Sequence, residues 1–299
     1  MQKVSHKTSQ PHRKPKPPFP AQKQKSPGLE WKMNPRPKFT GPDYRPAGKL
    51  FGKKALIAGG DSGIGRAVAI LYAREGADVA ITYLPIEKRD AQETQTYVEA
   101  LGRRCVLIEG DLSKENFCQR AVEKTVTRLG AIDILVSNAA HQMRKDFIDE
   151  ITSEEWDKTF KTNVYAYFHL VKTAVKYMKP GSSIIATSSE TASKAPKELL
   201  DYSATKGAIN TLTKSLAQML IDKQIRVNAV APGPVWSPLN ISDEGTRVSK
   251  VKQFGKNQPI QRPAQPEEVA PAYVFLASEA DSSYITGAIL AETGGFPVA

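Results

Sequence analysis

Cysteine and histidine are scarce in this chain. Its 299 residues include only 2 Cys and 4 His. Cys105 and Cys118 do not have the spacing of metal ligands, and two thiols are too few for a disulfide framework. We therefore expect no zinc site and no other bound metal. The low cysteine content also favours a reducing compartment, so we expect a cytoplasmic protein.

Long apolar stretches are also missing. The sequence contains no run of roughly 18 or more apolar residues, the length that a membrane-spanning helix needs. The N-terminus carries lysines and prolines but not the apolar core of a secretory signal. We therefore expect no membrane span and no such signal.

Acidic side chains are few in the first 48 residues, which are strongly basic as a result. Residues 1–48 hold 11 Lys and Arg against Glu30 and Asp43, so they carry +9 of the net charge of +11. Clustered lysines and arginines support weak, salt-sensitive contacts with nucleic acid. Residues 49–299 are close to neutral and show no recognition motif, so we expect no specific nucleic-acid partner.

Proline is enriched in the same extension, which contains 10 of the 21 prolines. Runs such as Pro15-Lys16-Pro17-Pro18 exclude helix and central strand, because proline lacks the backbone donor and clashes with the preceding turn. We expect about the first 25 residues to be disordered, with polyproline II character. Apolar side chains in residues 26–48 suggest a strap on a folded surface, and a wholly solvated tail is the alternative. These side chains are Leu29, Trp31, Met33, Phe39 and Tyr44.

From residue 49 onward, short apolar runs alternate with longer amphipathic stretches. Alternation of this kind indicates βαβ units, and apolar strands without polar alternation are buried on both faces. We expect residues 49–299 to form a single α/β domain, a doubly wound Rossmann-type parallel sheet with helices on both faces. The predicted strands are 55–58, 79–83, 105–108, 132–137, 183–187, 226–230 and 288–291, and the predicted helices include 65–75, 90–101, 114–129, 155–178, 202–222 and 266–277.

A glycine-rich turn links the first predicted strand to the following helix. It reads Gly59-Gly60-Asp61-Ser62-Gly63-Ile64-Gly65-Arg66. Free N–H groups at a helix N-terminus bind phosphate, and glycine allows the phosphate to approach closely. The spacing G-x-x-x-G-x-G differs from the common dinucleotide pattern G-x-G-x-x-G. A tight structural turn is therefore the alternative.

Polar side chains also follow two other predicted strands. Asp111 comes after the third strand and Asn138 after the fourth. Ligands of open α/β sheets bind at the carboxyl ends of the strands, so both residues are candidates for the same site. Ordinary turn or capping roles are the alternative for each.

A serine, a tyrosine and a lysine complete the candidate chemistry. Ser189 follows the fifth predicted strand, and Tyr202 and Lys206 are four apart in a helical pattern. That spacing places both on one helix face, one turn apart. An ammonium group beside a phenol lowers the phenol's pKa from its usual value of about 10. Tyr202 would then exchange protons nearer neutral pH, although a Tyr and a Lys at this spacing are common without any function.

Taken together, the motifs resemble the short-chain dehydrogenase/reductase family over roughly residues 50–295. The resemblance is to N-terminally extended members described as aldehyde reductases or glucose dehydrogenases. The family's T-G-x-x-x-G-x-G turn matches with Ala58 in place of Thr, and its N-N-A-G motif appears with two substitutions. The matching segments are Gly59, Gly63 and Gly65, then Ser137-Asn138-Ala139-Ala140, Asn163, Ser189, Tyr202 with Lys206, and Pro232-Gly233-Pro234-Val235.

The resemblance implies an NAD(P)-dependent oxidoreductase that transfers hydride between nicotinamide and a carbonyl or alcohol. Tyr202 would exchange a proton with the substrate oxygen, assisted by Lys206, which would also bond the nicotinamide ribose. Ser189 would orient the carbonyl, and Asn163 would anchor a water that links Lys206 to solvent. The implied cofactor-binding residues are Gly59, Asp61, Ser62, Gly63, Ile64, Gly65, Tyr83, Asp111, Leu112, Asn138, Ala139, Tyr202, Lys206, Pro232, Gly233 and Val235.

A non-catalytic NADP-binding regulatory module is the alternative. Such a module would need the glycine turn but not Ser189, Tyr202 and Lys206, and all three are present.

The end of the second predicted strand bears on the choice of cofactor. An acidic residue there would bond the ribose 2′-hydroxyl of NAD and repel the 2′-phosphate of NADP. Tyr83 occupies this position, and the basic residues Arg66, Lys88 and Arg89 lie near it in the sequence. We therefore expect NADP(H) to be favoured over NAD(H).

The substrate and the oligomeric state are less closely defined. The segment 236–255 is polar with scattered apolar residues, and we expect it to act as a lid over the substrate. A small aldehyde, a ketone and a sugar remain open as substrates. His141 and Gln142 are candidates for the pocket, with a surface loop as the alternative. The resemblance also implies a homotetramer built through the predicted helices 155–178 and 202–222.

Overall fold

One all-parallel sheet forms the centre of the molecule. The computed structural model describes residues 14–297. Its strands have the order β3-β2-β1-β4-β5-β6-β7, so the chain moves outward from β1 in one direction and then in the other. This is the doubly wound arrangement predicted from the sequence. The strands are β1 (Lys54–Ala58), β2 (Asp78–Tyr83), β3 (Cys105–Glu109), β4 (Ile134–Ser137), β5 (Ser183–Thr187), β6 (Arg226–Pro232) and β7 (Ile289–Glu292).

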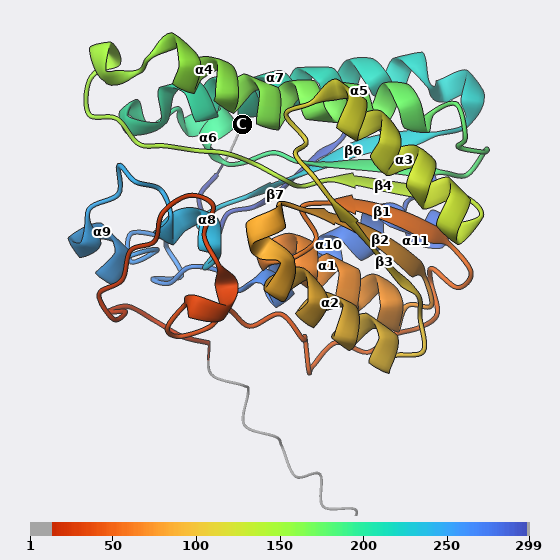
Figure 1. Cartoon of the computed structure of the whole chain (residues 1–299), viewed down its shortest axis with the longest axis horizontal. Coiled ribbons are helices and arrows are strands. Elements are labelled where there is room, and N and C mark those ends of the chain that lie inside the picture. Colours follow the sequence, from red (N-terminus) through yellow and green to blue (C-terminus); the bar gives the residue numbers. More distant parts are fainter. Residues whose placement is uncertain (1–13, 298–299) are drawn as a thin grey trace, which may run out of the picture.

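Helices cover both faces of the sheet (Figure 1). One layer contains α1 (Gly63–Arg74), α2 (Lys88–Ala100) and α10 (Pro266–Ala277), followed by the short α11 (Glu279–Ser282). The other layer contains α3 (Glu115–Leu129), α4 (Ser153–Phe160), α5 (Ala166–Ala174) and α7 (Leu200–Met219). Short helices flank these layers: α6 (Thr191–Lys194), α8 (Pro238–Ile241), α9 (Val248–Lys252), and 3-10 turns at Glu30–Lys32, Pro85–Glu87, Ile148–Glu150, Lys197–Leu199 and Ile221–Lys223.

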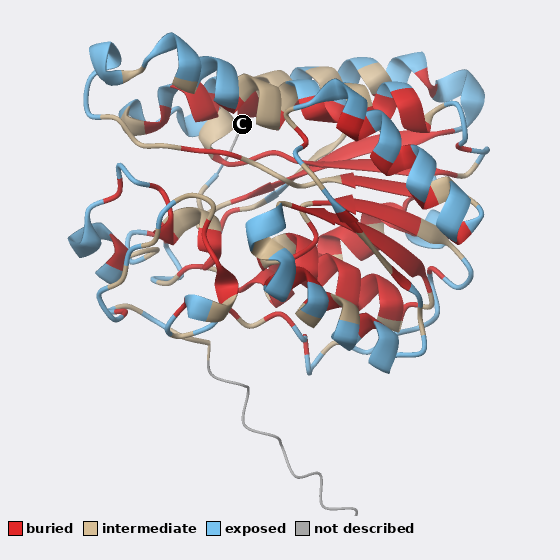
Figure 2. Ribbon diagram, in the orientation of Figure 1, coloured by how far each residue is buried: buried red, intermediate tan, exposed pale blue. Residues whose placement is uncertain are grey.

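The strands are buried because each face of the sheet supports its own apolar core (Figure 2). Successive side chains of a strand point to opposite faces. In β1, Leu56 packs into the core under α3, α5 and α7, whereas its neighbour Ile57 packs into the core under α1 and α10. Both side chains have no exposed surface. This two-sided burial explains the uninterrupted apolar runs in the sequence.

One predicted helix, 155–178, is divided in the structure. It forms α4, a π-helical segment at Lys161–Tyr165, and α5. The π-helical turn contains Asn163, whose side-chain oxygen accepts a hydrogen bond from the His141 backbone N–H at 2.7 Å. Its side-chain nitrogen donates to the His141 carbonyl at 2.9 Å. Single π-helical turns of this kind often mark functional sites, and this one carries Asn163 to the loop after β4.

The basic extension lies on the domain over its described part, residues 14–48. In Figure 1 its red segment runs beside α8 and α9. Phe19 stacks on Trp236, with ring centroids 4.0 Å apart, and the Trp236 indole N–H donates to the Pro35 carbonyl at 2.9 Å. Leu29, Met33 and Phe39 are buried, as expected for a strap.

The expectation of disorder fails for residues 14–25. Proline prevents helix and strand there, but it does not prevent an extended segment from packing through an aromatic side chain. Phe19 is only 4% exposed, and its N–H donates to the Lys252 carbonyl at 2.8 Å. Residues 1–13, which were also expected to be disordered, lie outside the described part of the chain.

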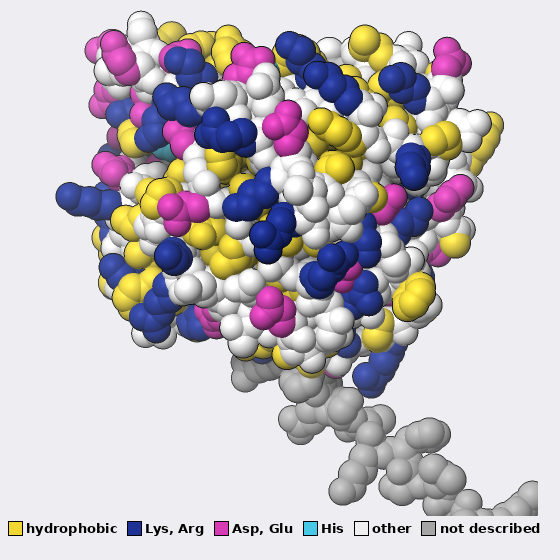
Figure 3. Space-filling view, turned by 45° about the vertical axis from the view of Figure 1, so that its right-hand side comes forward, with side chains coloured by type: hydrophobic (Ala, Val, Ile, Leu, Met, Phe, Trp, Pro, Cys, Tyr) yellow, Lys and Arg dark blue, Asp and Glu magenta, His cyan; other side chains and the backbone are white. Residues whose placement is uncertain are grey.

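Two surface properties complete the description. Between residues 14 and 297, no helix combines the length and apolar character that crossing a bilayer requires. On the face shown in Figure 3, lysines and arginines are interspersed with aspartates and glutamates.

Candidate active site

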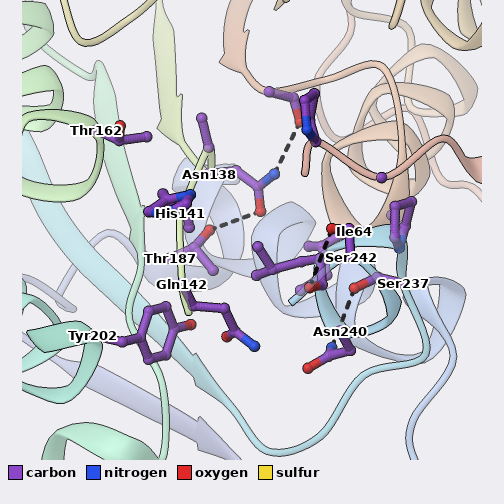
Figure 4. Close-up of a pocket in the computed structure, with 18 of the residues that line it drawn as sticks. Ile64, Asn138, His141, Gln142, Thr162, Thr187, Tyr202, Ser237, Asn240 and Ser242 are labelled. Carbon is purple, nitrogen blue, oxygen red and sulfur yellow. Dashed lines mark hydrogen bonds between the residues drawn. The ribbon is translucent and has the colours of Figure 1, made fainter. Parts of the chain in front are cut away.

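A cavity of about 630 Å³ opens at the carboxyl ends of the strands. Its walls come from the ends of β1 to β6, from the start of α7, and from the segment after β6. Figure 4 shows Tyr202 and Gln142 on one side of this space and Ile64, Ser237 and Asn240 across from them. The extension also contributes to the wall, through Ser26, Pro27 and Gly28.

The glycine turn is so closely packed that side chains are excluded from it. A Cβ on Gly65 would lie 1.9 Å from the Gly59 carbonyl oxygen, and one on Gly60 would lie 2.5 Å from Ile81 Cγ2. Gly59 and Gly63 have φ values of +74° and +51°, which favour glycine. The turn thus places the N-terminus of α1 directly against the cavity. A helix start without side chains in the way fits a diphosphate group.

Fifteen of the sixteen predicted cofactor-binding residues line the cavity. Gly65 does not line it, because it lies behind the turn in contact with Gly59. The residues on the wall are Gly59, Asp61, Ser62, Gly63, Ile64, Tyr83, Asp111, Leu112, Asn138, Ala139, Tyr202, Lys206, Pro232, Gly233 and Val235.

Asn138 and Asp111 also have structural roles. The Asn138 side-chain nitrogen donates to the Gly59 carbonyl at 2.9 Å, and its oxygen accepts from the Thr187 hydroxyl at 3.1 Å. Asn138 thus joins the ends of β1, β4 and β5. Asp111 accepts hydrogen bonds from the Ser113 N–H and hydroxyl. The capping and turn chemistry considered for these residues therefore coexists with a place on the cavity wall.

Ser189, Tyr202 and Lys206 meet at the cavity, as predicted. Lys206 is 1% exposed, its Nζ donates to the Thr187 carbonyl at 2.7 Å, and it lies 5.2 Å from the Tyr202 ring centroid. Burial lowers the pKa of Lys206 to about 7, because the buried environment disfavours the ammonium form.

The pKa of Tyr202 does not change in the predicted direction. Burial raises it to about 12, while a hydrogen bond with Ser189 and the charge of Arg144 act to lower it. The expectation that Lys206 lowers this pKa is therefore wrong for the structure described here. Sequence spacing showed that Lys206 is close, but it did not show that both groups are withdrawn from water, which favours their neutral forms.

Asn163 lies near the catalytic candidates but does not line the cavity. It is 2% exposed, and besides its two bonds to His141 its side-chain nitrogen donates to the Thr205 hydroxyl at 3.0 Å. Asn163 therefore fixes the loop after β4 to α7, next to Lys206 in the chain. His141 and Gln142 are buried on the cavity wall, which removes the surface-loop alternative for both.

Sequence reasoning missed Arg144 and its partner Asp243. Arg144 lines the cavity, and its guanidinium forms a 2.6 Å ion pair with Asp243, which is 1% exposed. The Arg144 backbone N–H donates to the same carboxylate at 2.8 Å. These bonds attach the segment 236–255, expected to be a lid, to the loop after β4. The two residues are 99 positions apart, and no local pattern indicates the pairing.

The basic residues proposed to favour NADP are not placed to do so. Arg66 has no exposed surface and forms ion pairs with Glu30, Asp90 and Glu93. The Arg89 guanidinium lies 4.0 Å from the Trp31 ring centroid, and neither Arg89 nor Lys88 lines the cavity. This part of the sequence argument for NADP is therefore wrong, because Arg66 pairs with Glu30 of the extension and Arg89 lies over Trp31 of the extension.

Two carboxyl groups, Asp61 and Glu87, line the cavity beside Tyr83. Asp61 is 4% exposed, and its Oδ2 has no hydrogen-bond partner within residues 14–297. Burial and mutual repulsion raise the pKa of Glu87, and burial raises that of Asp61. A buried, unpartnered carboxyl oxygen fits a ligand that brings a hydroxyl group.

Comparisons with known proteins agree with this geometry. The family model described as "Enoyl-(Acyl carrier protein) reductase" matches residues 58–297. General stress protein 39 of Bacillus subtilis is 53% identical over 278 residues, covering 93% of this chain and 96% of that protein. The NADPH-dependent aldehyde reductase 1, chloroplastic, of Arabidopsis thaliana is 47% identical over 277 residues, covering 90% of this chain and 94% of that protein.

Among solved structures, a short-chain dehydrogenase from Burkholderia cenocepacia in complex with NADP superimposes with a TM-score of 0.77. It is 32% identical and covers 83% of this chain and 98% of that chain. These similarities agree with the parallel sheet, with the glycine turn and with the grouping of Ser189, Tyr202 and Lys206. The chain belongs to the short-chain dehydrogenase/reductase family of NAD(P)-dependent oxidoreductases.

Proposed function

We propose that the protein transfers hydride between NADP(H) and a small carbonyl or alcohol substrate, with Tyr202 as the acid or base. The observation that carries this proposal is that the glycine turn and Tyr202 share one cavity. When bound, the cofactor supplies the hydride chemistry. The residues of the glycine turn, Asn138 and the segment Pro232–Val235 would hold it there.

The protein's own groups would manage the proton. Tyr202 is protonated at neutral pH, since burial raises its pKa to about 12, and a protonated phenol suits a donor to a carbonyl oxygen. Ser189 lies close enough to lower the pKa of Tyr202 and would orient the same oxygen. Lys206 would bond the nicotinamide ribose, and Asn163 would anchor the water that connects Lys206 to solvent. The substrate would be a small aldehyde, a ketone or a sugar.

Replacing Tyr202 by Phe tests the catalytic assignment. Tyr202→Phe removes the proton donor and keeps the ring, so we expect turnover to fall by roughly 10²- to 10⁴-fold or more. NADPH binding should be retained. The assay follows the absorbance of the reduced cofactor with aldehydes, ketones and sugars, and also runs in reverse with alcohols. Turnover similar to wild type in the variant would contradict the assignment, and binding without any turnover in the wild type would favour a regulatory module.

The raised pKa of Tyr202 can be tested in the protein without cofactor. We expect no ionisation of Tyr202 below pH 10, because burial disfavours the phenolate. Phenolate absorbance near 295 nm, titrated in the wild type and in Tyr202→Phe, isolates this one group as a difference. A midpoint for the difference below pH 10 would show that a nearby positive charge outweighs burial.

The preference for NADP(H) over NAD(H) is supported by two relatives and by one feature of the site. One relative is named as NADPH-dependent, and the solved neighbour is a complex with NADP. At the end of β2, Tyr83 stands where an acidic residue would repel a 2′-phosphate.

We expect kcat/KM with NADPH to exceed kcat/KM with NADH by at least about ten-fold, which corresponds to about 1.4 kcal/mol of differential binding. Initial rates with one substrate at a fixed pH measure both values. Equal efficiency with NADH would reject the preference while leaving the reaction class intact.

We further propose a homotetramer in the cytoplasm. Aromatic side chains are exposed along α4, the π-helical segment and α5, namely Trp156, Tyr165 and Phe168. Exposed apolar patches of this kind often mark protein interfaces. Light scattering should give about four times the chain mass of 32.8 kDa, and a monomeric mass would reject the proposal.

A further inference from the structure

The extension supplies a buried carboxylate to the glycine turn. Glu30 has no exposed surface, and its Oε2 accepts a hydrogen bond from the Gly63 N–H at 2.7 Å. Glu30 does not line the cavity, whereas Ser62, Gly63 and Ile64 do. The carboxylate therefore contacts the turn outside the cavity wall.

Arg66 extends this contact to the other end of the turn. Its guanidinium pairs with Glu30 Oε1 at 2.7 Å, and its Nε donates to the Asp61 carbonyl at 2.9 Å. Arg66 is fully buried. Glu30 thus contacts Gly63 directly and Asp61 through Arg66, which Asp90, Glu93 and Thr94 also hold in place.

The position of Glu30 is itself fixed by α2. The Asp90 carboxylate accepts hydrogen bonds from the backbone N–H groups of Glu30, at 2.9 Å, and Trp31, at 3.1 Å. Asp90 also pairs with Arg66 at 3.0 Å. The extension, the turn and α2 therefore form one buried polar network rather than a loose surface contact.

This network bears directly on how the turn can receive a ligand. The first N–H groups of a helix have no partner within the helix, and α1 begins at Gly63. Because Glu30 accepts a hydrogen bond from the Gly63 N–H, the orientation of the next peptide groups is fixed before any ligand binds. A binding site that is already ordered loses less entropy on binding.

We propose that Glu30 is a positioning residue for the dinucleotide cofactor. Through its contact with the Gly63 N–H, it holds the glycine turn in the conformation that binds the cofactor. The proposal rests on the NAD(P)-dependent reaction described above. Glu30 lies outside residues 58–297, which the family model matches, so the role belongs to the extension and not to the shared domain.

Two substitutions of Glu30 and one matched control test this role. Glu30→Ala removes the acceptor for both Gly63 and Arg66. Glu30→Gln keeps the size, but it replaces one of the two carboxylate oxygens by an NH2 group, which donates and cannot accept from Gly63 or Arg66. Glu93→Gln is the control, because Glu93 also pairs with Arg66 at 3.0 Å but makes no hydrogen bond to the glycine turn within residues 14–297, and its side chain is 26% exposed.

The measurement is the Kd of NADPH on the full chain, from the change in its fluorescence, with kcat at saturating cofactor and the thermal midpoint recorded alongside. Titration at pH 8 keeps Glu30 charged, since burial raises its pKa to about 7. We expect Kd to rise by roughly ten- to a hundred-fold in Glu30→Ala and by at least about five-fold in Glu30→Gln. We expect kcat to change by less than about three-fold, and Kd in Glu93→Gln to stay close to wild type.

A purely structural role would give a different pattern. A lowered thermal midpoint with an unchanged Kd in both Glu30 variants would overturn the proposal. If Glu30→Ala does not fold, Glu30→Gln decides, and a Kd equal to that of Glu93→Gln would reject the role. A wild-type protein that binds neither NADPH nor NADH would instead reject the proposed function.

Discussion

The close contact between Gly59 and Gly65 is the constraint on which the site depends. The backbone of β1 and the first turn of α1 can touch only because no Cβ stands between them, since one on Gly65 would lie 1.9 Å from the Gly59 oxygen. This contact brings the start of α1 to the carboxyl edge of the sheet. Because every strand of the sheet is parallel, the ends of β4, β5 and β6 reach the same edge, and one cavity collects side chains from all of them.

Burial determines the electrostatics of that cavity more than the pairing of charges does. Tyr202 and Lys206 are adjacent, yet burial moves both pKa values toward the neutral forms. Arg144 is the positive group that acts on Tyr202, and Asp243 holds it in place. The pKa of Tyr202 therefore depends on the segment after β6, through Asp243 and Arg144, as well as on α7.

Local patterns predicted the parts of the structure that local interactions determine. Apolar runs located the strands within a few residues. The motif spacing predicted the grouping of Ser189, Tyr202 and Lys206, and all three line one cavity. The failures share a different cause. Phe19 is buried against Trp236, Arg144 forms an ion pair with Asp243, and Arg66 forms an ion pair with Glu30. Partners far apart in sequence leave no periodicity or spacing to read.

The same long separations set an order of events during synthesis. The extension leaves the ribosome first, but the tryptophan on which Phe19 stacks follows more than two hundred residues later. Asp90 and Gly63, which receive the segment around Glu30, are made earlier than that tryptophan. The extension can therefore attach in two stages, first to the nascent β1–α1–β2–α2 unit and only at the end to the segment after β6. Until Trp236 has been made, the Phe19 ring has no partner to stack on, so the second stage of attachment falls within the last third of synthesis.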